Sequence, residues 1–192
     1  MNSQRRDLLR DTAIGVLASE GAHRLTHRKV DQAATLPPGT AKNYYPSRNA
    51  LLMAAAERVY ERYVADQAAL EAITGPADRE ALVTLLAELI RRGTGTDRTR
   101  LLASLELHAE ALRNPALGQL LAAQTEIDFA MYERVQRCAG LPVTESRSRV
   151  VARCMQAALV SLLTHPKEAL AAQGLDDLEG FVRGVLDTVY PR

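Results

Sequence analysis

Residues 25–52 read LTHRKVDQAATLPPGTAKNYYPSRNALL, and the fold that we predict for this chain follows mainly from them. Thr26 is suited to cap a short helix over 27–34, because its hydroxyl can accept a hydrogen bond from a free N–H of the first turn. A tight turn follows, and a second short helix is expected over 38–44. Pro38 suits the first turn of that helix, where its missing N–H is no loss. Two short helices joined by a tight turn are typical of the helix-turn-helix, whose second helix enters the major groove of DNA.

Helical periodicity continues on both sides of this stretch. Ala, Leu, Arg and Glu dominate, whereas the β-branched and aromatic residues that favour strands are sparse. Apolar positions, capping residues, glycines and prolines delimit further expected helices over 5–19, 48–71, 78–92, 97–113, 115–139, 144–164, 166–172 and 176–189. We therefore predict an all-α fold, with a helix-turn-helix domain over 1–46 and a larger helical domain over 47–192.

The charge is distributed unevenly along the chain. Residues 1–50 hold eight lysines and arginines against four acids, a net of +4, so the remainder carries −3 of the total of +1. A basic end is suited to a polyanionic partner. No apolar run is long enough for a membrane span or a signal peptide, which predicts a cytoplasmic protein. Cys138 and Cys154 lack the spacing of a metal site and are expected to be buried free thiols.

The expected second short helix has the chemistry of a DNA-recognition helix. Gly39 allows the backbone to approach a phosphate, and Lys42 supplies a positive charge. Thr40 and Asn43 can donate hydrogen bonds to phosphates or base edges.

The pairs Gly39-Thr40, Tyr44-Tyr45 and Ser47-Arg48 follow one another in a familiar order and spacing. In these residues the chain resembles, over about 50 residues, the DNA-binding region of the TetR family of bacterial repressors. The resemblance implies contacts with DNA phosphates or bases from Thr26, Arg28, Gly39, Thr40, Lys42, Asn43, Tyr44 and Arg48. Two positions depart from the family pattern: Pro37 replaces the usual serine or threonine cap, and Lys42 replaces an aromatic residue. The operator sequence therefore cannot be transferred from relatives.

Some of these residues also have a purely structural interpretation. Tyr44 and Tyr45 can fill the small core of the three-helix unit, and this is the stronger interpretation for Tyr45. Thr26 can serve only as a helix cap.

The resemblance also implies a dimer interface on the last two long helices and a small-molecule pocket among the middle ones. The helices over 144–164 and 176–189 carry broad apolar faces, which predicts a four-helix bundle between two subunits. The alternative is that both faces belong to the internal core, and periodicity alone does not separate the two.

The helix over 115–139 places Gln124 and Asp128 among its inward apolar residues. Burying an amide and a carboxylate costs free energy unless each finds a partner. They either pair with protein groups, of which His108 is a candidate, or meet a ligand. The candidate effector-binding residues are Leu105, His108, Gln124, Asp128 and Met131.

We predict a homodimeric regulator of transcription that binds operator DNA and is released by a small-molecule effector; repression follows from the resemblance. No motif of an enzyme, cofactor site or metal site is present. Glu106, His108 and Glu110 are conceivable metal ligands, but Glu110 falls opposite the apolar stripe Leu101, Leu105, Ala109 and Leu112, which favours a solvated face. The alternative function is a helical interaction module whose basic end binds no specific DNA sequence.

Overall fold

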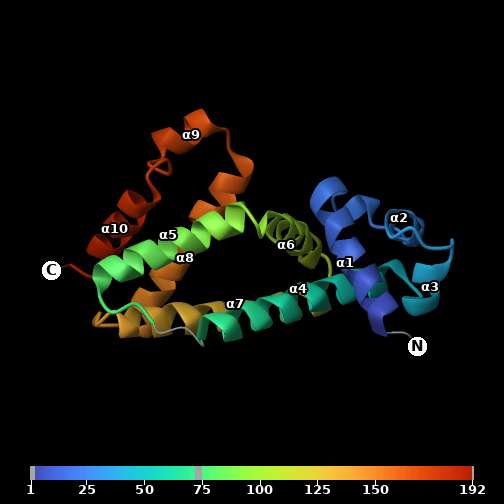
Figure 1. Cartoon of the computed structure of the whole chain (residues 1–192), viewed down its shortest axis with the longest axis horizontal. Coiled ribbons are helices and arrows are strands. Elements are labelled where there is room, and N and C mark those ends of the chain that lie inside the picture. The colour runs from blue at the N-terminus through green and yellow to red at the C-terminus, as the bar shows by residue number, and fades with distance from the viewer. Residues whose placement is uncertain (1–2, 72–74, 192) are drawn as a thin grey trace. The chain divides into compact units, whose positions relative to one another are not determined.

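The computed structural model describes residues 3–71 and 75–191, and for residues 67–71 it describes the backbone only. The described residues form helices and no strand, which confirms the all-α prediction (Figure 1). The N-terminal elements are α1 (Ser3–Glu20), the 3-10 turn η1 (Ala22–Arg24), α2 (His27–Ala33), α3 (Thr40–Tyr44) and α4 (Arg48–Glu71). They are followed by α5 (Arg79–Thr94), α6 (Arg98–Ala111), α7 (Pro115–Cys138), α8 (Glu145–Thr164), α9 (Lys167–Ala172) and α10 (Leu178–Val189).

Among the described helices, α2, α4, α5, α8 and α10 begin where a short polar side chain accepts a hydrogen bond from a free backbone N–H group. The Thr26 hydroxyl accepts from Lys29 N at 3.2 Å and starts α2. Ser47 Oγ accepts from Ala50 N at 3.0 Å at the start of α4. Such caps satisfy donors that have no partner inside the helix, so they fix where these helices start.

The chain divides into two compact units. The first comprises Met1–Asp66 and Thr99–Gln124, and the second comprises Gln67–Arg98 and Thr125–Arg192. The first unit is thus larger than the helix-turn-helix domain expected over 1–46, because it also includes most of α4, nearly all of α6 and the start of α7.

The core of the first unit joins the three N-terminal helices to α4. Leu9 and Leu17 of α1, Val30 of α2, Ala41 of α3 and Leu52 of α4 are all at most 1% exposed. Removal of these apolar side chains from water stabilises the unit and holds α2 and α3 in one arrangement.

The core of the second unit is formed by α5, α7, α8 and α10. Among the described residues, this unit also buries the polar side chains of Gln136 on α7, which is completely buried, and Ser148 on α8, which is 1% exposed. Gln136 Nε2 donates to Ser148 Oγ at 3.0 Å, and its Oε1 accepts from Tyr190 OH at 2.8 Å. Because both ends of the amide have partners, its burial is tolerated.

In the described ranges, no helix combines the length and the apolar composition that crossing a membrane requires.

Candidate nucleic-acid interface and the sites linked to it

The turn between α2 and α3 contains two left-handed residues. Thr35 has a φ of 55°, and Gly39, immediately before α3, has a φ of 90°. Glycine adopts this conformation without the steric cost that a Cβ brings. Gly39 therefore makes the final bend of the turn, and α3 begins at Thr40 instead of the predicted residue 38.

The side chain of Asp31 on α2 holds the first turn of α3. Its Oδ2 accepts a hydrogen bond from Gly39 N at 2.7 Å, and its Oδ1 accepts one from Ala41 N at 2.7 Å. Asp31 is only 3% exposed, so these hydrogen bonds form away from water. Pro37 offers no side-chain acceptor at this helix start, and Asp31 supplies it from the preceding helix. Sequence analysis did not identify this residue.

The predicted DNA-contacting residues are mostly accessible. Exposed side chains or backbone are found at Thr26, Arg28, Gly39, Lys42, Asn43 and Arg48, whereas Thr40 and Tyr44 are half-buried. The Thr40 hydroxyl donates to the Pro37 carbonyl at 2.6 Å and so also serves the turn.

The two tyrosines at the end of α3 differ in their surroundings. Tyr45 is 4% exposed, and its hydroxyl donates to the Arg6 carbonyl at 3.4 Å. Its own carbonyl lies 2.6 Å from Nε2 of His27. Tyr45 therefore belongs to the core, where it joins α3 to α1 and α2, while Tyr44 keeps part of its ring accessible.

Several cations of the basic end are already engaged inside the first unit. Lys29 Nζ lies 2.8 Å from Glu20 Oε1. The Arg48 guanidinium donates to the Ala22 carbonyl at 2.5 Å and lies 3.6 Å from Glu110 Oε2. A DNA phosphate at Arg48 would thus compete with these two acceptors.

The acidic side of α6 contacts η1 and the start of α4, the elements that flank the helix-turn-helix. Glu106 Oε2 accepts from Ala22 N at 2.8 Å, and Glu110 lies against Arg48. The residues of α6 that are fully buried are Ala103 and Leu107, whereas Leu112 is 84% exposed. The prediction that Leu101, Leu105, Ala109 and Leu112 form the inward stripe and that Glu110 lies on a solvated face is therefore wrong.

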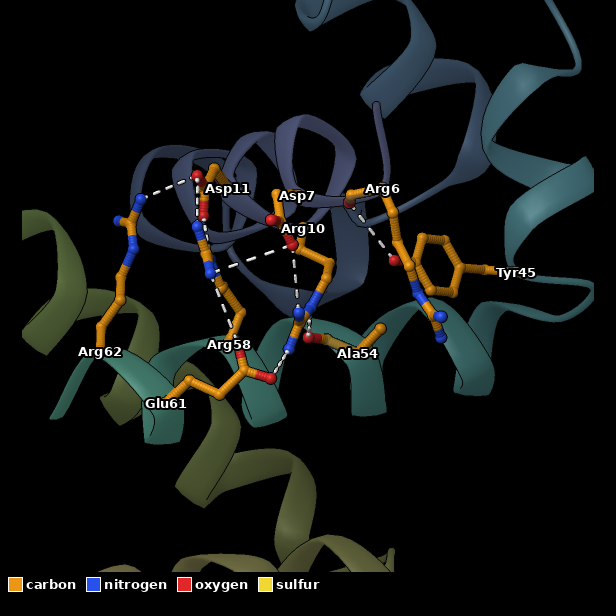
Figure 2. Close-up of polar contacts among 9 residues, drawn as sticks. All are labelled: Arg6, Asp7, Arg10, Asp11, Tyr45, Ala54, Arg58, Glu61 and Arg62. Atoms are coloured by element: carbon orange, nitrogen blue, oxygen red, sulfur yellow. Dashed lines mark hydrogen bonds and ion pairs between the residues drawn. The ribbon is translucent and has the colours of Figure 1, made fainter. Parts of the chain in front are cut away.

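An ion-pair network joins α1 to α4 (Figure 2). Arg10 is 8% exposed; its Nε donates to the Ala54 carbonyl at 3.1 Å, and its Nη2 lies 2.5 Å from Glu61 Oε1. Arg58 Nε lies 2.8 Å from Asp11 Oδ1. The hydrogen bond from Arg10 lowers the pKa of Glu61, and the hydrogen bond with Asp11 raises the pKa of Arg58. Both groups stay charged near neutral pH.

This network has a mechanical consequence. If α1 shifted on α4, the largely buried Arg10 guanidinium would lose its α4 partners Ala54 and Glu61 and keep only Asp7 of its own helix, and breaking a buried ion pair is strongly destabilising. We infer that α1 and the N-terminal part of α4 move as one body.

The candidate effector-binding residues are divided between the two units. Leu105, His108 and Gln124 belong to the first, and Asp128 and Met131 belong to the second. Met131 is buried, whereas the His108 ring is exposed and its Nδ1 lies 2.8 Å from the Ser104 carbonyl of its own helix.

Asp128 has a protein partner on α8. Its Oδ2 accepts a hydrogen bond from Gln156 Nε2 at 3.1 Å. Burial raises the pKa of this carboxyl group from 3.8 to about 6, against the opposing effect of the hydrogen bond. Of the two alternatives for Asp128, a protein partner or a ligand, the structure shows a protein partner, Gln156.

Asp128→Asn is expected to increase the free energy of unfolding by about 3 kcal/mol at pH 7. Because the pKa of Asp128 is raised in the folded state, its ionisation destabilises the fold as the pH rises from about 4 to 6. Asparagine keeps an acceptor for Gln156 and cannot ionise. Urea unfolding at pH 7 and below pH 4 checks this, since the gain should vanish in acid. An equal gain at both pH values would contradict it.

Apolar side chains remain accessible on α8 and α10. A groove of about 550 Å³ is lined by Val150 and Cys154 of α8 and by Phe181, Val185 and Val189 of α10, among others. Val150 is 49% exposed, and Val160 on the same helix is 43% exposed. These are the helices that we expect to form the dimer interface.

Both cysteines are free, but they are not buried as predicted. Cys138 is exposed at the end of α7, and Cys154 is half-buried beside the groove. In the described parts of the chain, no group of three His, Cys, Asp or Glu side chains is placed to hold a metal ion.

An all-helical chain with an N-terminal helix-turn-helix and a separate helical unit is the architecture of a class of transcriptional regulators. A family model described as "Tetracyclin repressor-like, C-terminal domain" matches residues 77–188, which is more than half of the 192 residues. The chain therefore belongs to the tetracycline-repressor-like, or TetR, family, as the N-terminal motif predicted. No curated protein matches the chain.

Solved structures share this fold over almost the whole chain. A TetR-family member from Streptomyces coelicolor, SCO1917, is 25% identical, with 98% of this chain and 99% of that chain covered and a TM-score of 0.70. The multidrug binding protein EbrR, complexed with ethidium, is also 25% identical, with 98% and 99% covered and a TM-score of 0.70. A protein from Saccharomonospora viridis, solved with choline, is 18% identical, with 97% of both chains covered and a TM-score of 0.79.

Proposed function

We propose that this protein is a homodimeric, sequence-specific DNA-binding regulator, a repressor that a small-molecule effector releases from its operator. The observation that carries the proposal is the clamped start of α3, where buried Asp31 fixes the backbone and leaves Lys42 and Asn43 exposed. A lysine is suited to phosphate and an asparagine to base edges. The predicted contacts at Thr26, Arg28, Gly39, Thr40, Tyr44 and Arg48 belong to the same proposal. Such a regulator works in the cytoplasm, beside the DNA it binds.

The dimer is proposed to form through α8 and α10. Their accessible apolar side chains would be covered by the same helices of a second copy, in a two-fold interface. Two linked helix-turn-helix units can bind half-sites about 34–36 Å apart only if they hold that separation. A small change in their spacing is then enough to release DNA.

The effector is proposed to act through α4. Its candidate contacts remain those predicted from the sequence: Leu105, His108 and Gln124 in the first unit, and Asp128 and Met131 in the second. Because Arg10 and Arg58 tie α1 to α4, a change in the angle of α4 would move α1 with it. EbrR has been solved with ethidium, proflavin and malachite green, so these compounds form a sensible first panel for effector screening.

The double substitution Lys42→Ala, Asn43→Ala is expected to abolish selective binding to the operator. It removes one phosphate contact and one base contact per subunit and leaves the buried residues of α3 in place. The measurement is binding of wild type and variant to the DNA upstream of the protein's own coding sequence, at two salt concentrations. If neither that DNA nor a genomic selection yields a selectively bound site, the interaction-module alternative replaces this proposal.

A further inference from the structure

We propose that Arg6, in the first turn of α1, makes an additional phosphate contact beside the recognition helix. The inference rests on the proposed DNA-binding function and adds to it a residue outside the helix-turn-helix motif itself.

The position of Arg6 is fixed by the end of α3. Tyr45 directly follows α3, and its buried hydroxyl group binds the carbonyl of Arg6 at 3.4 Å. Figure 2 shows the Arg6 side chain alongside the Tyr45 ring. The carbonyl of Tyr45 in turn lies 2.6 Å from His27 Nε2, at the first residue of α2. Arg6 is therefore anchored at the same end of α3 as Thr26, which precedes His27 and is itself a proposed phosphate contact.

The Arg6 guanidinium interacts with the uncharged Tyr45 side chain, a contact that leaves its positive charge unneutralised. Its side chain is exposed and, among the described residues, makes no ion pair. In the adjacent residue Asp7, Oδ1 lies 3.3 Å from Arg10 Nη1 and 3.9 Å from Arg58 Nη1. These two arginines neutralise the Asp7 carboxylate. Lys29 and Arg48 are likewise engaged by carboxylates. An exposed guanidinium with no carboxylate partner is suited to a phosphate, to which it can donate two parallel hydrogen bonds.

A phosphate contact has a specific signature. Each phosphate that a protein neutralises releases condensed counterions, so the slope of log K against log salt steepens by about 0.9 per contact. The contact orients the protein without reading bases, so its loss should weaken binding to every sequence by a similar factor.

The test compares Arg6→Gln and Arg6→Lys with wild type on the operator duplex and on a scrambled duplex, from about 0.05 to 0.3 M salt. Arg6→Gln should make the salt slope shallower by about 1 for each bound subunit and weaken binding to both duplexes about tenfold at the lowest salt. Arg6→Lys should keep the slope. Both substitutions leave the main-chain carbonyl that Tyr45 uses. Arg98→Gln, at an exposed arginine of the second unit, is the charge-matched control and should match wild type.

Each outcome is decisive for one of the two proposals. If wild type binds selectively and Arg6→Gln binds with the same affinity and slope, the Arg6 contact is disproved and the proposed function stands. A loss of affinity with an unchanged slope and a lowered melting temperature would assign Arg6 a structural role and overturn the inference. If wild type selects no DNA site, the proposed function itself fails.

Discussion

Asp31→Ala is expected to weaken operator binding at least tenfold and to lower the free energy of unfolding by about 2–4 kcal/mol. The substitution removes the acceptors of Gly39 N and Ala41 N, both bound at 2.7 Å. A buried N–H that loses its acceptor costs about 1–3 kcal/mol, and both donors lose it together. Without the clamp, the first turn of α3 no longer holds Lys42 and Asn43 in one orientation. Titration of a labelled operator and urea unfolding measure the two effects.

Two further variants separate the effect of Asp31 on the orientation of α3 from its effect on the stability of the fold. Asp31→Asn keeps one acceptor oxygen and should fall between wild type and Asp31→Ala. Asp78→Ala removes the cap of α5 in the second unit, where the carboxylate accepts from Ala81 N at 2.9 Å. It should cost about 1 kcal/mol of stability and leave operator affinity unchanged. If Asp31→Ala likewise lost stability alone, Asp31 would be only structural.

The sequence predicted the helices well because their signals are local. The helix over 48–71 was found with the same bounds, and Thr26 caps its helix as the capping preference indicated. These signals lie within a few residues of the backbone groups they satisfy, so no knowledge of the tertiary fold is needed. The family motif between Gly39 and Arg48 is likewise recognised from residues that lie close together in the sequence.

Residues whose partners lie far along the chain were missed. Arg10 was counted only as part of a basic end, yet it binds Ala54 and Glu61, 44 and 51 residues away. Asp31 was not singled out, although a charged residue directly after Val30, on the inward side of a short helix, is a signal that could have found it. The spacing of charges does not show which ones the tertiary fold brings together.

The prediction of the buried face of α6 was wrong for a different reason. A helix with apolar residues on two sides has more than one possible inward stripe, and periodicity does not choose between them. The leucines at 101, 105 and 112 favoured a stripe that the fold does not bury. The fully buried residues are instead Ala103 and Leu107, and Glu106 accepts a hydrogen bond from a backbone N–H of η1. For Asp128, the partner Gln156 lies 28 residues away on another helix, which the pattern of α7 alone does not contain.

Gly184→Gln is expected to dissociate the proposed dimer and to weaken operator binding about 100-fold or more. Gly184 lines the groove over α8 and α10, and a Cβ added there meets no atom within 4 Å. A single subunit therefore accommodates glutamine, which also favours a helix over glycine. In a dimer, the new side chain would lie where two helices approach. Sedimentation equilibrium and operator titration measure the two losses, which are coupled because an isolated subunit reads only one half-site.

The matched control is Gly118→Gln on α7, where an added Cβ also has open space. It brings the same gain in helix propensity and the same added side chain, so it should remain dimeric and bind the operator like wild type. If Gly184→Gln were equally dimeric, the groove would not be the subunit interface. The accessible apolar residues Val150 and Val160 would then have to be covered elsewhere, and the spacing of the two recognition helices would have to be set by another surface.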